Sequence, residues 1–222
     1  QQSSRSSTCG DSIQGAKGGM HRPCSTLRPA LLAALSAPAR CAVDLALHDL
    51  WGQLLGQPLW RLWGLDAHTT VSTSVTLGLG PVAAVLDRLQ RWWEQLPATR
   101  VKLKLGSPDG LDHDRLLLRA VAERIAQRRQ QQGDSIELQV DANGGWTVDQ
   151  ARRMFSALVD ADVVLLEQPL APQTDPEQDR QGFAALHPHC PMPLVADESC
   201  WDLNDLLRLA PVVDGGNLKL LK

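Results

Sequence analysis

Apolar runs of strand length alternate with segments of helical periodicity along most of this chain. Beyond Gly64, each run rich in Val, Leu or Ile is followed by polar residues and then by apolar positions three and four residues apart. Short apolar runs predict strands, and the wider spacing predicts amphipathic helices. We expect strands at 71–79, 100–105, 136–141, 163–167, 194–197 and 217–221, and helices at 81–95, 111–131, 148–158, 177–186 and 203–209.

The repeated order of strand and helix predicts a parallel sheet with right-handed crossovers, either open and doubly wound or closed as a (β/α) barrel. Polar residues at the strand ends favour the barrel. An open sheet binds its ligand at one switch point, whereas here five successive strands each deliver a charged residue near the C-terminal end. We therefore predict an α/β fold of the (β/α)8 TIM-barrel type. It is incomplete, with about six βα units, because the pattern supplies six strands where a full barrel has eight.

The first part of the chain lacks this alternation. Residues 1–36 are rich in Ser, Gly, Gln and Arg without periodicity, which predicts a low-complexity or disordered lead-in. Residues 37–68 begin with apolar positions at helical spacing, and Gly56 and Pro58 are stop signals. We expect a buried helix over 39–55 within this helical segment, which precedes a partial barrel over 69–222.

Composition narrows the possible partners. The chain has 22 Lys+Arg and 25 Asp+Glu, a net charge of -3, which predicts a small-molecule substrate rather than nucleic acid or a membrane surface. The five cysteines are widely separated, which favours reduced thiols in the cytoplasm. The apolar run at 30–35 superficially resembles a secretory signal, but it is short and internal.

Lysines flank the predicted site. Lys102 and Lys104 alternate with apolar residues in the run 101–105, so on a strand they share one face. If the apolar face meets the helices, both ammonium groups lie inside the barrel, where desolvation and mutual repulsion depress the pKa of a lysine toward the neutral base. The alternative is an edge strand with solvated charges, and this motif alone does not decide. Lys219 shares a strand face with Asn217, and we expect it to point inward.

Three carboxylates follow apolar runs on adjacent predicted strands: Asp141, Glu167 and Asp197. Together they would form an oxygen-rich site that suits Mg²⁺. Any one of them could instead cap the next helix, but three in succession between lysines make that interpretation the weaker one. Thr76, on the first predicted strand, is a candidate for substrate contact.

The motifs KxK, DAN, EQP, ADES and NLKLLK, in this order, resemble the enolase superfamily. Within it the resemblance is to the muconate lactonizing enzyme subgroup, and specifically to dipeptide epimerases of the L-Ala-D/L-Glu type. It runs from about residue 37 to the last residue, and it implies a barrel preceded by an α+β capping domain, most of which has no counterpart here. We therefore expect a fragment, a truncated gene product or a mis-bounded reading frame, whose two open sheet edges invite association.

The resemblance also implies a role for each motif residue. Asp141, Glu167 and Asp197 would bind Mg²⁺, Lys104 and Lys219 would be the acid/base pair, and Lys102 would support the substrate carboxylate. Asn143 and Glu198 would lie just outside the metal ligands. One lysine would remove an α-proton to give a metal-stabilised enediolate, and the other would protonate the opposite face.

Several alternatives remain open at this stage. The same residues would serve an N-acylamino acid racemase, an o-succinylbenzoate synthase or a muconate cycloisomerase. The chain could also be an inactive fragment that acts as a binding or assembly protein. A homo-oligomer is possible.

Overall fold

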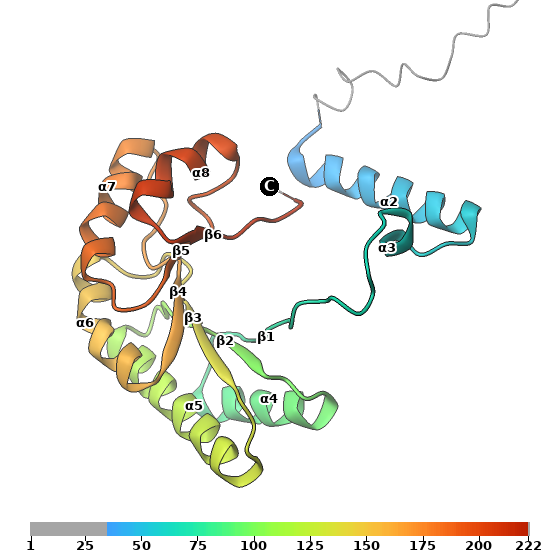
Figure 1. Cartoon of the computed structure of the whole chain (residues 1–222). Coiled ribbons are helices and arrows are strands. Elements are labelled where there is room, and N and C mark those ends of the chain that lie inside the picture. The colour runs from blue at the N-terminus through green and yellow to red at the C-terminus, as the bar shows by residue number, and fades with distance from the viewer. Residues whose placement is uncertain (1–34, 222) are drawn as a thin grey trace, which may run out of the picture.

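Six parallel strands form one curled sheet in the computed structural model, which describes residues 35–221 (Figure 1). Neighbouring strands in the sheet are also neighbours in the sequence, so every connection is a crossover through a helix. The strands are β1 (Val75–Leu77), β2 (Arg100–Lys104), β3 (Glu137–Asp141), β4 (Val163–Glu167), β5 (Leu194–Ala196) and β6 (Gly215–Gly216). The helices are α2 (Ala37–Leu55), α3 (Leu59–Leu62), α4 (Val82–Gln95), α5 (Leu111–Gln132), α6 (Val148–Asp160), α7 (Pro176–Leu186) and α8 (Leu203–Leu209).

The core lies between the sheet and the helices on its outer side (Figure 1). In β2 the side chains of Val101 and Leu103 are fully buried, while Lys102 and Lys104 on the other face are partly exposed. This alternation confirms the predicted orientation, because a strand turns successive side chains to opposite faces. Leu117 of α5, Met154 of α6 and Phe183 of α7 complete the core from the helix side. The inner face of β2 is thereby left to basic residues.

The predicted barrel helices α4 to α8 are confirmed within two residues at each end, whereas the edge strands are shorter than predicted. β1 covers only 75–77 of the predicted 71–79, and Val71 is 90% exposed. The last strand is Gly215–Gly216, before the predicted 217–221, and Leu220 is 81% exposed. Edge strands hydrogen-bond to one neighbour only, so less of each apolar run is held in the sheet.

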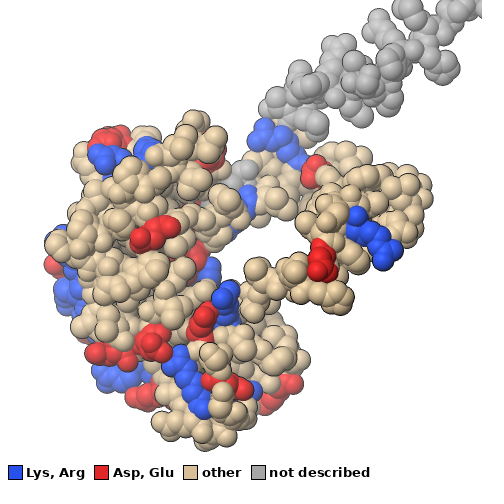
Figure 2. All heavy atoms as spheres, viewed as in Figure 1, with Lys and Arg blue, Asp and Glu red and all other residues tan. Residues whose placement is uncertain are grey.

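The expected burial of the first helix is wrong. Gly52 is the only buried residue of α2, and Leu54 is 75% exposed. Leu45 and Leu47, two residues apart and so on different sides of the helix, are both exposed, which leaves apolar side chains around much of its circumference. α2 and α3 stand apart from the sheet and present a surface with few charges (Figures 1 and 2). Among the described residues, no layer packs across this helix.

The predicted lead-in at 1–36 lies outside the described residues except for its last two. The division between 37–68 and 69–222 stays a prediction. Charges of both signs are mixed over the face of the barrel helices that Figure 2 shows. None of the helices within residues 35–221 combines the length and apolar character that a membrane crossing requires.

Candidate active site

Strand register places three site residues at one level of the sheet. Lys104 pairs with Asp141, and Asp141 pairs with Glu167 on the next strand. Asp197 directly follows β5, whose Val195 pairs with Glu167. Because side chains at one level of a parallel sheet point to the same face, sequence positions far apart converge at the C-terminal ends of the strands.

The three carboxylates form a buried acid cluster, defined as Asp141, Glu167 and Asp197. Their exposed fractions are 0%, 3% and 1%. One carboxylate oxygen from each lies within 4.8 Å of the others. Three negative charges at this separation repel one another strongly, so the cluster requires compensating positive charge.

Each carboxylate of the cluster is paired with a different lysine. Lys104 Nζ donates to Asp141 Oδ2 at 2.6 Å, Lys102 donates to Glu167, and Lys219 donates to Asp197. The lysine side chains are 17–39% exposed, whereas the carboxylate side chains are at most 4% exposed. These three are all the lysines between residues 35 and 221. The structure thus brings together every lysine and carboxylate that the sequence analysis placed at the site's centre.

The environment of Lys219 favours its protonated form. Desolvation acts to lower the pKa of Lys219, but the hydrogen bond to Asp197 and the negative charges of Asp197, Glu198 and Glu167 outweigh it and raise the pKa above the usual value. Lys219 is therefore an ammonium group at neutral pH in this arrangement.

Glu198 and Asn143 connect the loops around the cluster. The Asn143 backbone N–H donates to Asp141 Oδ1 at 2.9 Å, and its side-chain amide donates to Glu198 Oε1 at 3.3 Å. Glu198 Oε2 is buried and has no hydrogen-bond partner among the described residues. An unsatisfied carboxylate oxygen beside three buried carboxylates fits a positively charged occupant. Carboxylate oxygens are the ligands that Mg²⁺ prefers, so the donor set fits this ion.

Two further residues that the sequence analysis did not assign contact the cluster. Asn217 Nδ2 donates to Glu167 Oε1 at 2.8 Å, and Gln168 Oε1 accepts the backbone N–H of Asp197 at 2.9 Å. Two features of the sequence could have identified these residues. Asn217 shares a strand face with Lys219, and Gln168 directly follows Glu167. Thr76 lies beside Lys102 in the register and is exposed, and its contact with substrate stays a prediction.

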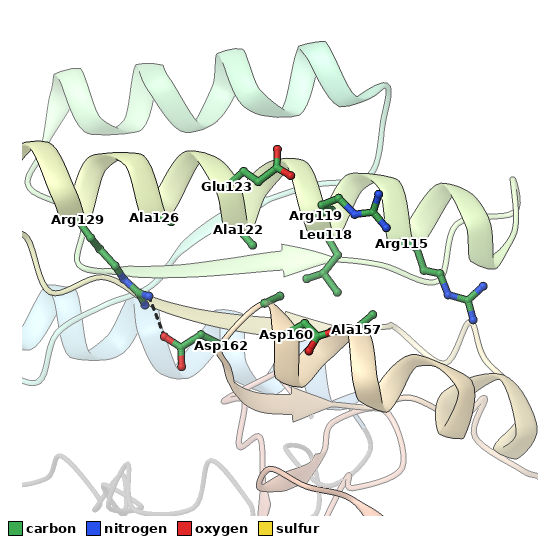
Figure 3. A pocket seen from close by; sticks show the side chains of 11 residues that line it. Arg115, Leu118, Arg119, Ala122, Glu123, Ala126, Arg129, Ala157, Asp160 and Asp162 are labelled. Atoms are coloured by element: carbon green, nitrogen blue, oxygen red, sulfur yellow. Dashed lines mark hydrogen bonds and ion pairs between the residues drawn. The ribbon is translucent and has the colours of Figure 1, made fainter.

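A separate groove of about 460 Å³ lies on the outside of the barrel between α5 and α6 (Figure 3). Arg115 and Arg119 lie toward one end, and the ion pair between Arg129 and Asp162, at 2.8 Å, lies toward the other. None of the acid cluster or its lysines lines this groove. The acid cluster and its lysines therefore lie apart from this groove.

Comparison with known proteins agrees with this geometry. Residues 84–220 match the model of the family described as "Enolase C-terminal domain-like", and the chain belongs to this family. Its parallel sheet with outer helices is accordingly an incomplete TIM barrel of the enolase superfamily.

Similar proteins of this family carry epimerase names. A hydrophobic dipeptide epimerase of Roseobacter litoralis is 38% identical over 197 residues, which cover 89% of this chain and 54% of the relative. An L-Ala-D/L-Glu epimerase of Bacteroides thetaiotaomicron is 32% identical over 83% of this chain and 43% of the relative. The crystal structure of a dipeptide epimerase from Enterococcus faecalis V583, complexed with Mg and L-Leu-L-Tyr, has a TM-score of 0.67 and 31% identity, covering 85% of this chain and 49% of that one. The chain spans about half the length of the relatives it matches.

Proposed function

We propose that this protein catalyses Mg²⁺-dependent epimerisation at an α-carbon next to a carboxylate, by proton transfer between two lysines. The observation that carries the proposal is the placement of Lys104 and Lys219. They contact different members of the acid cluster, and they come from β2 and from the segment after β6, with β3 to β5 between them. Two proton carriers on either side of one metal-binding centre suit the inversion of a stereocentre.

Each charged residue of the site would have its own role in the reaction. Asp141, Glu167 and Asp197 would hold Mg²⁺, which when bound supplies positive charge against the negative charge that develops on the substrate carboxylate. Lys104, in its neutral form, removes the α-proton of one epimer. Lys219, as the ammonium ion, gives a proton to the opposite face, and the roles reverse for the other epimer. Lys102 adds a positive charge beside Glu167 that supports the substrate carboxylate.

For the substrate we propose a dipeptide of the L-Ala-D/L-Glu type. Support comes from the names of the relatives, which include hydrophobic dipeptide and L-Ala-D/L-Glu epimerases. A muconate cycloisomerase of Acinetobacter lwoffii is also 34% identical over 78% of the chain. The same lysines and carboxylates would serve that reaction, N-acylamino acid racemisation or o-succinylbenzoate synthesis, because the fold alone does not choose among them. A cytoplasmic location and a homo-oligomer stay predictions.

The proposal is tested by α-proton exchange in D₂O, followed by ¹H NMR. The panel contains L-Ala-L-Glu, a hydrophobic dipeptide, an N-succinyl amino acid and muconolactone, each with Mg²⁺ and again with a chelator. We expect deuterium to enter a dipeptide at its α-carbon and the exchange to stop when the metal is chelated. Exchange confined to another member of the panel would reassign the substrate.

Lysine variants test the two-base mechanism. Lys104→Ala should abolish exchange of one epimer and Lys219→Ala that of the other, because each lysine serves one face. Arg100→Ala is the matched control, since Arg100 lies on the same strand as Lys104 but pairs with Glu137 at 2.7 Å, away from the acid cluster. Mg²⁺ binding by a folded protein without any exchange would instead support a binding or assembly role.

A further inference from the structure

Two buried aspartates outside the acid cluster occupy equivalent places in the fold. Asp114 is the fourth residue of α5 and Asp179 the fourth residue of α7, with exposed fractions of 1% and 4%. Neither contacts the cluster's carboxylates or lysines in any hydrogen bond of the described chain. Burial of a carboxylate is costly unless several donors satisfy it, so their contacts indicate what they do.

Asp114 ties the loop after β2 to the loop after β3. Its carboxylate accepts the backbone N–H groups of Gly106 and Ser107, at 3.0 and 3.1 Å, from the loop that precedes its own helix. It also accepts Nε1–H of Trp146 at 2.7 Å, from the next loop along the sheet. Gly106 is two residues beyond Lys104, and Trp146 belongs to the loop that follows Asp141. One buried carboxylate therefore connects the two loops that directly follow this lysine and this acid.

Backbone packing shows how closely these two loops approach. Gly106 has φ +81°, and a Cβ at this position would lie 2.1 Å from the carbonyl oxygen of Ala142. A Cβ on Gly145 would lie 2.4 Å from the Cα of Gly106. The loops meet backbone to backbone where only glycine fits. A small displacement of either loop would therefore move the other.

Asp179 has a similar arrangement one pair of strands further along, and it also forms an ion pair with Arg208 of α8 at 3.6 Å. It accepts the backbone N–H of Gln173 at 3.3 Å from its own loop, and the hydroxyl of Ser199 at 3.0 Å from the loop after β5. The Ser199 hydroxyl in turn accepts Nε2–H of Gln168 at 2.8 Å. Gln168 directly follows Glu167, and its Oε1 receives the backbone N–H of Asp197. The chain of hydrogen bonds thus ends on the backbone of Asp197 and passes through Gln168, the covalent neighbour of Glu167.

We infer that Asp114 and Asp179 are positioning residues, each of which fixes the geometry of one half of the site. Asp114 fixes Lys104 relative to Asp141, and Asp179, through Ser199 and Gln168, fixes Asp197 relative to Glu167. The inference rests on the proposed function, because it assigns these residues to the geometry of the same proton-transfer site. Misplacement of reacting groups by about 1 Å costs about 100-fold in rate, so bridges of this kind matter for catalysis beyond their effect on stability.

The test uses Asp114→Asn and Asp179→Asn, which keep the side-chain shape but replace one acceptor oxygen by an NH₂ group that faces N–H or O–H donors. Asp112→Asn is the matched control in the first turn of α5, because the Asp112 side chain is 98% exposed. The readout is the ¹⁵Nζ NMR spectrum of protein labelled in its five lysines, three of which lie in the site. Signals are assigned with single Lys→Arg variants.

We expect a split response. Asp114→Asn should shift the Lys104 signal and leave that of Lys219 in place, while Asp179→Asn should do the reverse. Asp112→Asn should shift neither. In an active protein, both buried variants should lower kcat by about 10- to 100-fold with little change in KM, because the geometry of the reacting groups changes rather than substrate binding.

Equal shifts of all site lysines in both variants, or no shift in either, would overturn the inference, because a general loosening of the fold does not act on one half alone. If Asp114→Asn does not fold, Trp146→Phe removes the indole N–H donor to Asp114 while keeping an aromatic ring in the core, and it should still shift Lys104 selectively. The NMR readout does not require turnover. A selective shift in a protein without exchange activity would therefore support the positioning inference while contradicting the proposed reaction.

Discussion

The acid cluster should couple Mg²⁺ binding to folding stability, and Glu167→Gln isolates this coupling. Two unit charges 4.8 Å apart, the upper limit of the separations between the three ligand oxygens of the cluster, repel by about 3.5 kcal/mol at an effective dielectric constant of about 20. Glu167 takes part in two of the three repulsions, and it also attracts Lys102. The substitution removes both kinds of interaction, which have opposite signs. We therefore expect the free energy of unfolding without metal to change by no more than about 2 kcal/mol.

The part of the free energy of unfolding that Mg²⁺ binding contributes should change more. Mg²⁺ at about 100 times its dissociation constant stabilises a folded protein by about 2.7 kcal/mol. Without the Glu167 carboxylate, the same Mg²⁺ concentration should add less than about 0.5 kcal/mol, because affinity falls when one of three anionic ligands is lost. The quantity to measure is the difference between the Mg²⁺ increments of the two proteins, where the increment is the gain in the free energy of unfolding on adding Mg²⁺. Effects of the substitution on the metal-free fold cancel in this difference.

Urea unfolding of both proteins, with chelator and with Mg²⁺, gives these increments if the slopes with denaturant stay equal. Asp112→Asn is the control for the loss of one negative charge, and it should keep the full Mg²⁺ increment because its side chain is 98% exposed on α5. A Glu167→Gln protein that retains the parent increment would refute the assignment of the acid cluster as the Mg²⁺ site.

Two further predictions concern residues that stabilise the fold around the site. The hydrogen bond from the Leu194 backbone N–H lowers the pKa of Asp214, so this carboxylate stabilises the fold above its unfolded pKa of about 4. That stability is lost as pH falls through the depressed folded pKa, so Asp214→Asn should lower the melting temperature at pH 7, and the difference from the parent should shrink progressively in melts below about pH 4. Gly106→Ala should destabilise the protein by more than about 2 kcal/mol in urea, because its Cβ would meet the Ala142 carbonyl. Gly133→Ala, at a similar positive φ with open space around it, should cost only about 1 kcal/mol; equal costs would contradict the close loop packing.

The central strands and the site were predictable from the sequence because both depend on local periodicity. A period of two fixes which side chains share a face, so the alternation in the run 101–105 places Lys102 and Lys104 together, opposite Val101 and Leu103. The same rule, applied to apolar runs that each end in an acid, located Asp141, Glu167 and Asp197 at one end of the sheet. Parallel order then brings these ends together.

Features that depend on contacts between distant segments could not be predicted in this way. Helical spacing identified α2 but not what covers it, since burial depends on the surfaces that surround a helix. Gly215 and Gly216 carry no side-chain pattern and are unfavourable in strands, so β6 could not be recognised from the sequence. The bridge from Asp179 to Gln168 joins different loops through Ser199, and no local pattern predicts it.

The distribution of the two basic residue types supports proton transfer over a purely structural ion-pair network. On the surface, arginines pair with acids, as Arg128 does with Asp134 and Arg180 with Glu177. In the described chain, lysine occurs only at the acid cluster, at Lys102, Lys104 and Lys219. A structural ion pair gains from the planar, two-pronged guanidinium group, so arginine would serve that role at least as well. Lysine differs in that its ammonium can lose a proton in a buried site, whereas arginine stays protonated, and a reaction that removes and returns an α-proton needs this property.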